Sequence, residues 1–174
     1  KLGESVAGLI KHFAKLEERI AAVDNAIEEA ANASLVSNVE ESFQRPDGSM
    51  LESRSFQGRS VSRKDAIESA KYLTEYPVRR EKERHDIEAQ IQELRLREEE
   101  GAITESDQQR MNELMIQQQE LLKKEADARR DVAVALGHEE NLRAAEEEQL
   151  RAANRQREIE IDMLQKEQNE YDSH

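Results

Sequence analysis

The four histidines are the side chains of this chain best suited to bind a metal or to move a proton. None of them belongs to a His-x-x-x-His or a Glu-x-x-His pair. Protein metal sites need several converging ligands, and helical sites often take two of them from one such pair. We therefore predict no metal site and expect solvent-facing histidines at His12, His85, His138 and His174.

Serines gather between residues 37 and 62, where the chemistry to look for is a nucleophile or a phosphate-binding loop. Gly58-Arg59-Ser60 lacks the further glycines and the preceding strand that a phosphate-binding loop needs. The sequence places no histidine or aspartate to activate a serine. It therefore predicts a polar segment without catalytic residues or a cofactor site, in a protein that is not an enzyme.

An acidic group at Glu98, Glu99 and Glu100 falls at the tip of an expected helical hairpin. The simpler interpretation is that aspartate and glutamate favour helix N-termini and that a solvated tip tolerates charge. The alternative is a regulatory coiled-coil finger whose acidic tip inserts into a partner enzyme and binds Mg²⁺ there. In shape alone, such a finger is similar to the regulators that enter the secondary channel of RNA polymerase.

Two of the three phenylalanines, Phe43 and Phe56, lie in a repeated Ser-Phe-Gln within a segment that interrupts the helical pattern. A long two-stranded rod offers little core for them. They pack on each other or on the rod, or they anchor a partner, because exposed aromatic side chains are favoured anchors. With the acidic tip, they are the candidate partner-binding residues.

The composition predicts long helices instead of an ordinary globular core. Of 174 residues, 37% are charged and 3% are aromatic, with two prolines, six glycines and no cysteine. The net charge of −13 disfavours nucleic acid and anionic lipid as partners. No apolar run approaches the roughly 20 residues that span a bilayer. We expect a soluble protein without direct membrane insertion, either cytoplasmic or secreted or virion-associated.

Residues 1–36 are expected to form an N-terminal heptad helix that ends near Val36, where Ser37 and Asn38 favour a stop. Apolar residues there alternate in steps of four and three over about four heptads. The seam consists of Leu2, Val6, Leu9, Phe13, Leu16, Ile20, Val23, Ile27 and Ala30. Such a seam needs a partner, so we expect a protein partner or self-association through it.

Residues 37–62 are expected to be an ordered loop or a small β-hairpin. Pro46-Asp47-Gly48 is a strong turn signal, because proline presets φ, aspartate bonds nearby backbone and glycine accepts a positive φ. Short apolar and polar stretches flank this turn, and any hairpin is expected around it.

Residues 63–139 are predicted to form a long antiparallel coiled-coil helical hairpin with its turn at residues 101–104. Gly101 suits a left-handed helix end, and Thr104 with Asp107 suits the start of the next helix. Pairing residues at equal distance from the turn brings apolar residues together near the tip and opposite charges together in the middle. The expected pairs include Leu94 with Met111, Ile91 with Leu114, and Arg80 with Glu125.

Residues 140–174 are expected to continue the second hairpin helix into one long spine over residues 105–172, with a weak point at Gly137. The predicted fold is therefore all-α and elongated. The sequence favours an acidic coiled-coil structural or protein-interaction module, a spacer or docking arm. Its composition suits a larger assembly such as a virion, a secretion system or a secreted bacterial toxin.

Overall fold

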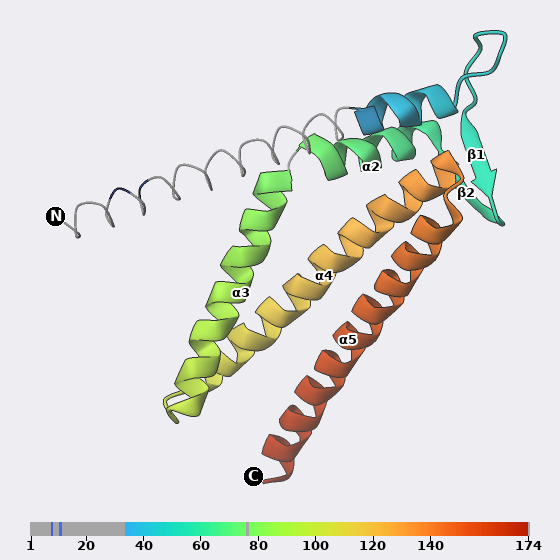
Figure 1. Cartoon of the computed structure of the whole chain (residues 1–174). Helices are drawn as coiled ribbons and strands as arrows, with labels where there is room; N and C mark the ends of the chain where they lie inside the picture. The colour runs from blue at the N-terminus through green and yellow to red at the C-terminus, as the bar shows by residue number, and fades with distance from the viewer. Residues whose placement is uncertain (1–7, 9–10, 12–33, 76, 174) are drawn as a thin grey trace.

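The computed structural model describes residues 8, 11, 34–75 and 77–173 of the chain, and this part is mostly helical (Figure 1). The elements are a helical segment at residues 34–42, β1 (Ser53–Phe56), β2 (Arg59–Ser62), α2 (Arg63–Glu75), α3 (Pro77–Glu99), α4 (Glu105–Leu136) and α5 (Glu139–Asp172). The all-α prediction holds apart from one small two-stranded sheet. The heptad seam predicted at residues 2–30 lies outside the described residues, because the two described positions in this stretch, Gly8 and Lys11, are not members of the seam.

The first described helix does not end near Val36, as we had expected, but continues to residue 42. Tertiary packing outweighs the local stop signal, because Val39 is fully buried and Leu35 packs against the same core. The helix ends where the Ser42 hydroxyl donates to the carbonyl of Val39, at 2.6 Å.

The Pro-Asp-Gly turn forms, but the β-hairpin of this region lies elsewhere. Asp47 accepts a hydrogen bond from the Ser49 amide at 2.9 Å. An isolated antiparallel bridge joins Gln44 and Met50 on either side of this turn. The hairpin pairs β1 with β2 in antiparallel register, around a turn at Gln57 and Gly58. The expected position of the hairpin was therefore wrong.

Local capping interactions determine where α2 and α4 begin and where α3 ends. The Ser62 hydroxyl accepts from the Asp65 amide at 3.1 Å at the start of α2. Gly101 has φ +72° after α3, and Thr104 forms a reciprocal capping box with Asp107 before α4. The chain therefore reverses at residues 101–104, and α3 and α4 lie antiparallel (Figure 1).

The prediction of one long continuous spine helix was wrong, because α4 ends at Leu136 and α5 returns along α4 (Figure 1). Gly137 takes a left-handed conformation, with φ +69°, and its amide donates to the carbonyl of Ala133. Alanines on the inner face of α5, including Ala145 and Ala152, allow it to lie close to α4, and both are buried. Residues 139–172 therefore form another helix of a bundle instead of prolonging a rod.

Two apolar clusters hold the fold, and α4 contributes to both. The junction core lies where the chain reverses between α4 and α5, and the tip core lies between α3 and α4. The junction core contains Val39, Phe43, Val61, Ala66, Ala70, Val132, Ala133, Val134, Ala135 and Leu142. The tip core contains Ile87, Ile91, Leu94, Met111 and Leu114. With 32 residues, α4 is about 48 Å long and connects the two cores.

Candidate interaction surface

The structure places both loop phenylalanines against the junction core. Phe43 is 0% exposed. The ring of Phe56 packs over Gly137, with two ring carbons 3.7 Å from the position that a Cβ atom on this glycine would occupy. Phe43 is therefore a core residue, and none of its surface is accessible to a partner. Phe56 covers the turn that sends α5 back along α4.

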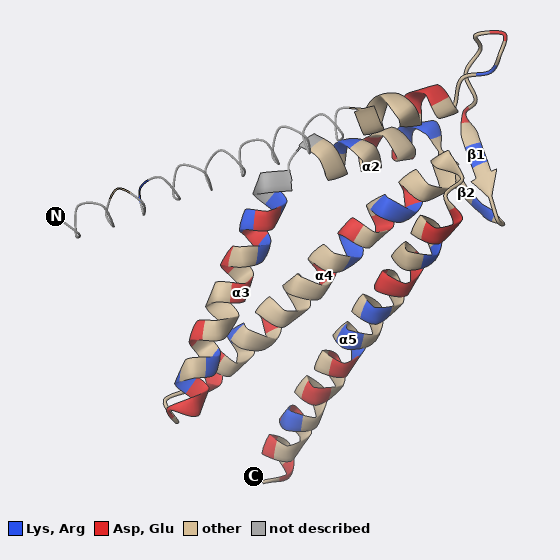
Figure 2. Ribbon diagram, viewed as in Figure 1, with Lys and Arg blue, Asp and Glu red and all other residues tan. Residues whose placement is uncertain are grey.

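The acidic tip is exposed and separate from the phenylalanines. Glu98, Glu99 and Glu100 lie at the end of α3 and at the start of the turn, at the far end of the α3–α4 pair (Figure 2). Among the described residues, none of these three carboxylates forms an ion pair, whereas neighbouring Arg97 contacts Glu93 at 3.3 Å. The tip therefore presents solvated negative charge.

Two further properties concern metal ions and membranes in the part of the chain that the structure describes. There, no three His, Asp or Glu side chains are grouped to hold a metal ion. None of the described helices is both long enough and apolar enough to cross a bilayer.

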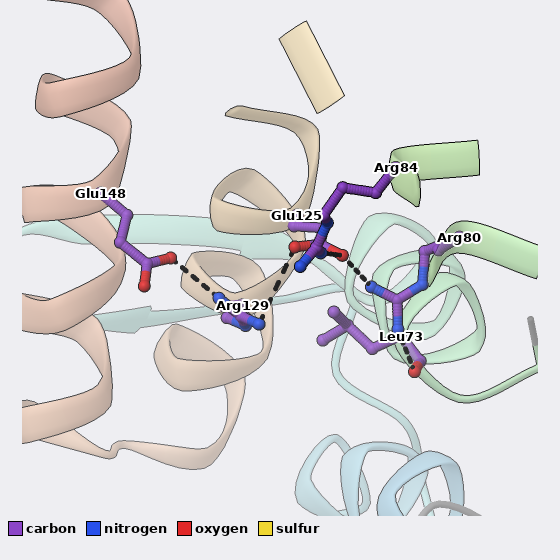
Figure 3. A network of polar contacts seen from close by, with 6 residues as sticks. All are labelled: Leu73, Arg80, Arg84, Glu125, Arg129 and Glu148. Carbon is purple, nitrogen blue, oxygen red and sulfur yellow. Dashed lines mark hydrogen bonds and ion pairs between the residues drawn. The ribbon is translucent and has the colours of Figure 1, made fainter. Parts of the chain in front are cut away.

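A charged network separates the two apolar cores. Glu125 of α4 is buried, with a side chain 8% exposed, and it accepts hydrogen bonds from Arg80, at 2.8 Å, and from Arg84 of α3 (Figure 3). Arg80 also donates to the carbonyl of Leu73 at 2.8 Å, which ties α3 to the end of α2. A buried carboxylate needs such partners, because burial without them is costly.

The network extends to α5 through Arg129. This arginine lies 3.9 Å from Glu125 and 2.8 Å from Glu148 of α5 (Figure 3). The sequence predicted the pairing of Arg80 with Glu125 from the hairpin register. It did not predict Arg129 with Glu148, because that contact exists only when α5 folds back. The network fixes the lateral positions of three helices.

Tyr72 of α2 and Asp131 of α4 both have side-chain pKa values raised above the ordinary value. The ring of Tyr72 lies under the cations of Arg80, 5.0 Å from the ring centre, and Lys124, 4.8 Å from it, and burial raises the pKa of its hydroxyl. Asp131 is half-buried and accepts a hydrogen bond from Ser69 at 2.8 Å. Burial raises the pKa of Asp131, and this hydrogen bond opposes the rise only in part.

The most unusual surface of the described residues is a row of large apolar side chains on the outer face of α5. We call it the α5 row, and it consists of Leu150 (63% exposed), Ile161 (46%), Leu164 (64%) and Tyr171 (83%). Three members are spaced by multiples of seven, so the row follows one face of the helix. Four of the seven large apolar side chains exposed in the described part of the chain are therefore on one helix face.

An open groove lies beside the first residue of the α5 row. It has a volume of about 640 Å³ between α4 and α5, and Leu150 and Ala153 form its apolar wall. Three cationic side chains, Lys123, Arg130 and Arg143, and two carboxylates, Glu146 and Glu147, also line it. This surface was not predicted from the sequence, because the spacing of Leu150, Leu164 and Tyr171 does not show which face of α5 is exposed.

Comparison with known proteins gives no further guide to this surface, since no protein-family model, curated protein or solved structure matches the chain.

Proposed function

We propose that this chain is a non-enzymatic structural or protein-interaction module, a coiled-coil spacer or docking arm of a larger assembly. A virion, a secretion system or a secreted bacterial toxin is the kind of assembly that its composition suits. The observation that supports this proposal is the α5 row.

A helix of a self-sufficient bundle normally places its largest apolar residues inside. On α5 the buried positions are two alanines with Leu142 and Ile159, while four large apolar side chains, those of the α5 row, stand in solvent. Leaving apolar area in water costs roughly 25 cal/mol per Å², and exposed apolar groups that gather on one face typically mark an interaction site. The α5 row is therefore the docking face of the proposed module.

Site-specific photo-crosslinking tests this function. A benzophenone amino acid at position 171 replaces Tyr171 with another exposed aromatic group, and the same group at position 96 replaces Leu96, which is 58% exposed on α3. We expect protein adducts from position 171 in the cells that make the protein, and far fewer from position 96. Failure of position 171 to capture any protein, including a second copy of the chain, would contradict the proposed function.

The acidic finger is the second candidate, supported by the exposed carboxylates of Glu98, Glu99 and Glu100, which form no ion pair with another described residue. In this alternative the tip reaches into a partner enzyme. Replacing all three with lysine should then abolish partner binding and regulation while the helical content stays unchanged. Intact binding and activity in the triple variant would exclude the finger.

A further inference from the structure

We propose that the α5 row binds α5 of a second copy of this chain, in the antiparallel direction. This inference rests on the proposed function and specifies the partner of the same surface. Its support comes from the charges along α5, from the position of the row relative to those charges, and from the groove beside Leu150.

The charges of α5 alternate along the helix (Figure 2), and its first ten residues, 139–148, contain five carboxylates and one arginine. Residues 149–157 contain three arginines and no carboxylate, whereas residues 158–172 contain six carboxylates and one lysine. A parallel pair of these helices would place like charges together, which disfavours association. An antiparallel pair with residue 150 opposite residue 171 places residues 149–157 of each copy opposite residues 164–172 of the other, which contain three carboxylates and one lysine, and it also aligns opposite helix dipoles. Residues 158–163, with three carboxylates, then face the same residues of the second copy.

The α5 row is centred close to the change of charge. It extends from Leu150 to Tyr171, about 32 Å along the helix, and the sign changes between Arg157 and Glu158. A two-fold axis near this point brings Leu150 opposite Tyr171 of the second copy and brings Ile161 close to its own counterpart. Such an interface is self-complementary, as a symmetric dimer requires.

The groove beside Leu150 gives Tyr171 of the second copy a place to bind. Tyr171 is the most exposed of the large apolar side chains described, and Glu170 and Asp172 flank it. The groove offers an apolar wall for the ring, and three cations line it, of which Arg130 and Arg143 already lie in ion pairs with Glu146 and Glu139. Among those cations Lys123 has no carboxylate partner in the described residues.

Arg157 lies within the row, seven residues from both Leu150 and Leu164. Its aliphatic stem can lie along apolar surface while its guanidinium stays in water. In the antiparallel pair Arg157 lies opposite Leu164 of the other copy, so the two Arg157 cations are kept apart. A parallel pair would instead bring the two Arg157 cations together.

Engineered cysteines test the direction directly, because the native chain contains none. Leu150→Cys and Tyr171→Cys variants are mixed in equal amounts and oxidised gently. We expect a disulfide between position 150 of one chain and position 171 of the other. Crosslinks that form only within each variant alone, or yields no higher than those of a Leu96→Cys control, would overturn the antiparallel pair.

A charge exchange tests the contact at the groove. Lys123→Glu should weaken dimerisation by about tenfold, because it places a carboxylate opposite Asp172. Combining Lys123→Glu with Asp172→Lys should restore most of the affinity, and Lys82→Glu, an exposed lysine on α3, is the matched control. Equal weakening by Lys82→Glu, or no rescue in the double variant, would count against the proposed contact.

The heptads predicted at residues 2–30 are the competing partner for the row, and further variants separate the two. If the dimer persists in Leu16→Glu with Ile20→Glu and disappears in Leu164→Glu, the inference stands. The reverse result would assign the dimer to the N-terminal heptads and overturn it. A monomer whose position 171 crosslinks only to a different protein would also overturn it, while the proposed docking function would remain.

Discussion

The junction core buries its large apolar side chains, whereas the α5 row leaves them exposed to solvent. Val39 and Phe43 of the junction core are 0% exposed, whereas Leu164 and Tyr171 of the row are 64% and 83% exposed. The first region holds the single chain together and closes the turn at Gly137. The second contributes little to the single chain. The difference indicates that folding and association use separate surfaces of this protein.

Phe43→Ala should give the largest loss of stability, because it empties a fully buried aromatic site in the junction core. We expect the free energy of unfolding to fall by about 3–5 kcal/mol. Chemical denaturation followed by circular dichroism measures the change. Phe56→Ala, at a half-buried position, is the control and should cost clearly less. Equal costs would mean that Phe43 is not the centre of this core.

Glu125→Ala should have the next largest effect, because it leaves Arg80 partly buried without its carboxylate. Removing one partner of a buried ion pair costs about 3 kcal/mol or more. Glu147→Ala removes an exposed carboxylate of α5 and should change the free energy of unfolding by less than about 0.5 kcal/mol. Similar values for the two variants would contradict the structural role of the charged network.

Two isoleucines within one turn of α5 lie on different faces of the helix, one buried and one exposed. Ile159 is 3% exposed and Ile161 is 46% exposed. Ile159→Ala should lower the stability of the monomer by about 2–3 kcal/mol, and Ile161→Ala should change it by less than about 0.5 kcal/mol. Denaturation at low protein concentration, where association is negligible, provides both values. The opposite order would mean that the two faces of α5 were assigned wrongly.

Asp131→Asn should give the smallest effect, and it should be stabilising at neutral pH. The raised pKa means that the folded state disfavours the carboxylate, so the native chain loses stability as the pH rises from about 3.8 through the folded pKa. Asparagine removes this loss and can still accept from Ser69. The advantage of the variant should therefore vanish in acid. A variant that is less stable at neutral pH would contradict this account.

The sequence predicted those parts of the fold that depend on local chemistry. The capping box of Thr104 and the reversal at Gly101 follow from residue types alone. The pairing of Arg80 with Glu125 followed because the turn fixes the register of the two helices. These features need no knowledge of the rest of the molecule.

The features that it missed lack a distinctive local signal. A glycine is tolerated inside a helix, so Gly137 alone did not reveal the return of α5, and His138 at the start of α5 provides no side-chain cap. The β1–β2 turn uses Gln57 with φ +48°, which is not a residue that hairpin turns favour. The α5 row could be identified only after the inner face of α5 was known.

The mass of the full chain in solution, measured by light scattering over a range of concentrations, tests the central claim most directly. We expect a dimer that becomes a folded monomer on Leu164→Glu, because a charge in the middle of the α5 row opposes apolar contact. Leu96→Glu, at a similarly exposed position on α3, should leave the dimer intact. A native chain that stays monomeric at every concentration, or a dimer that survives Leu164→Glu, would contradict the account.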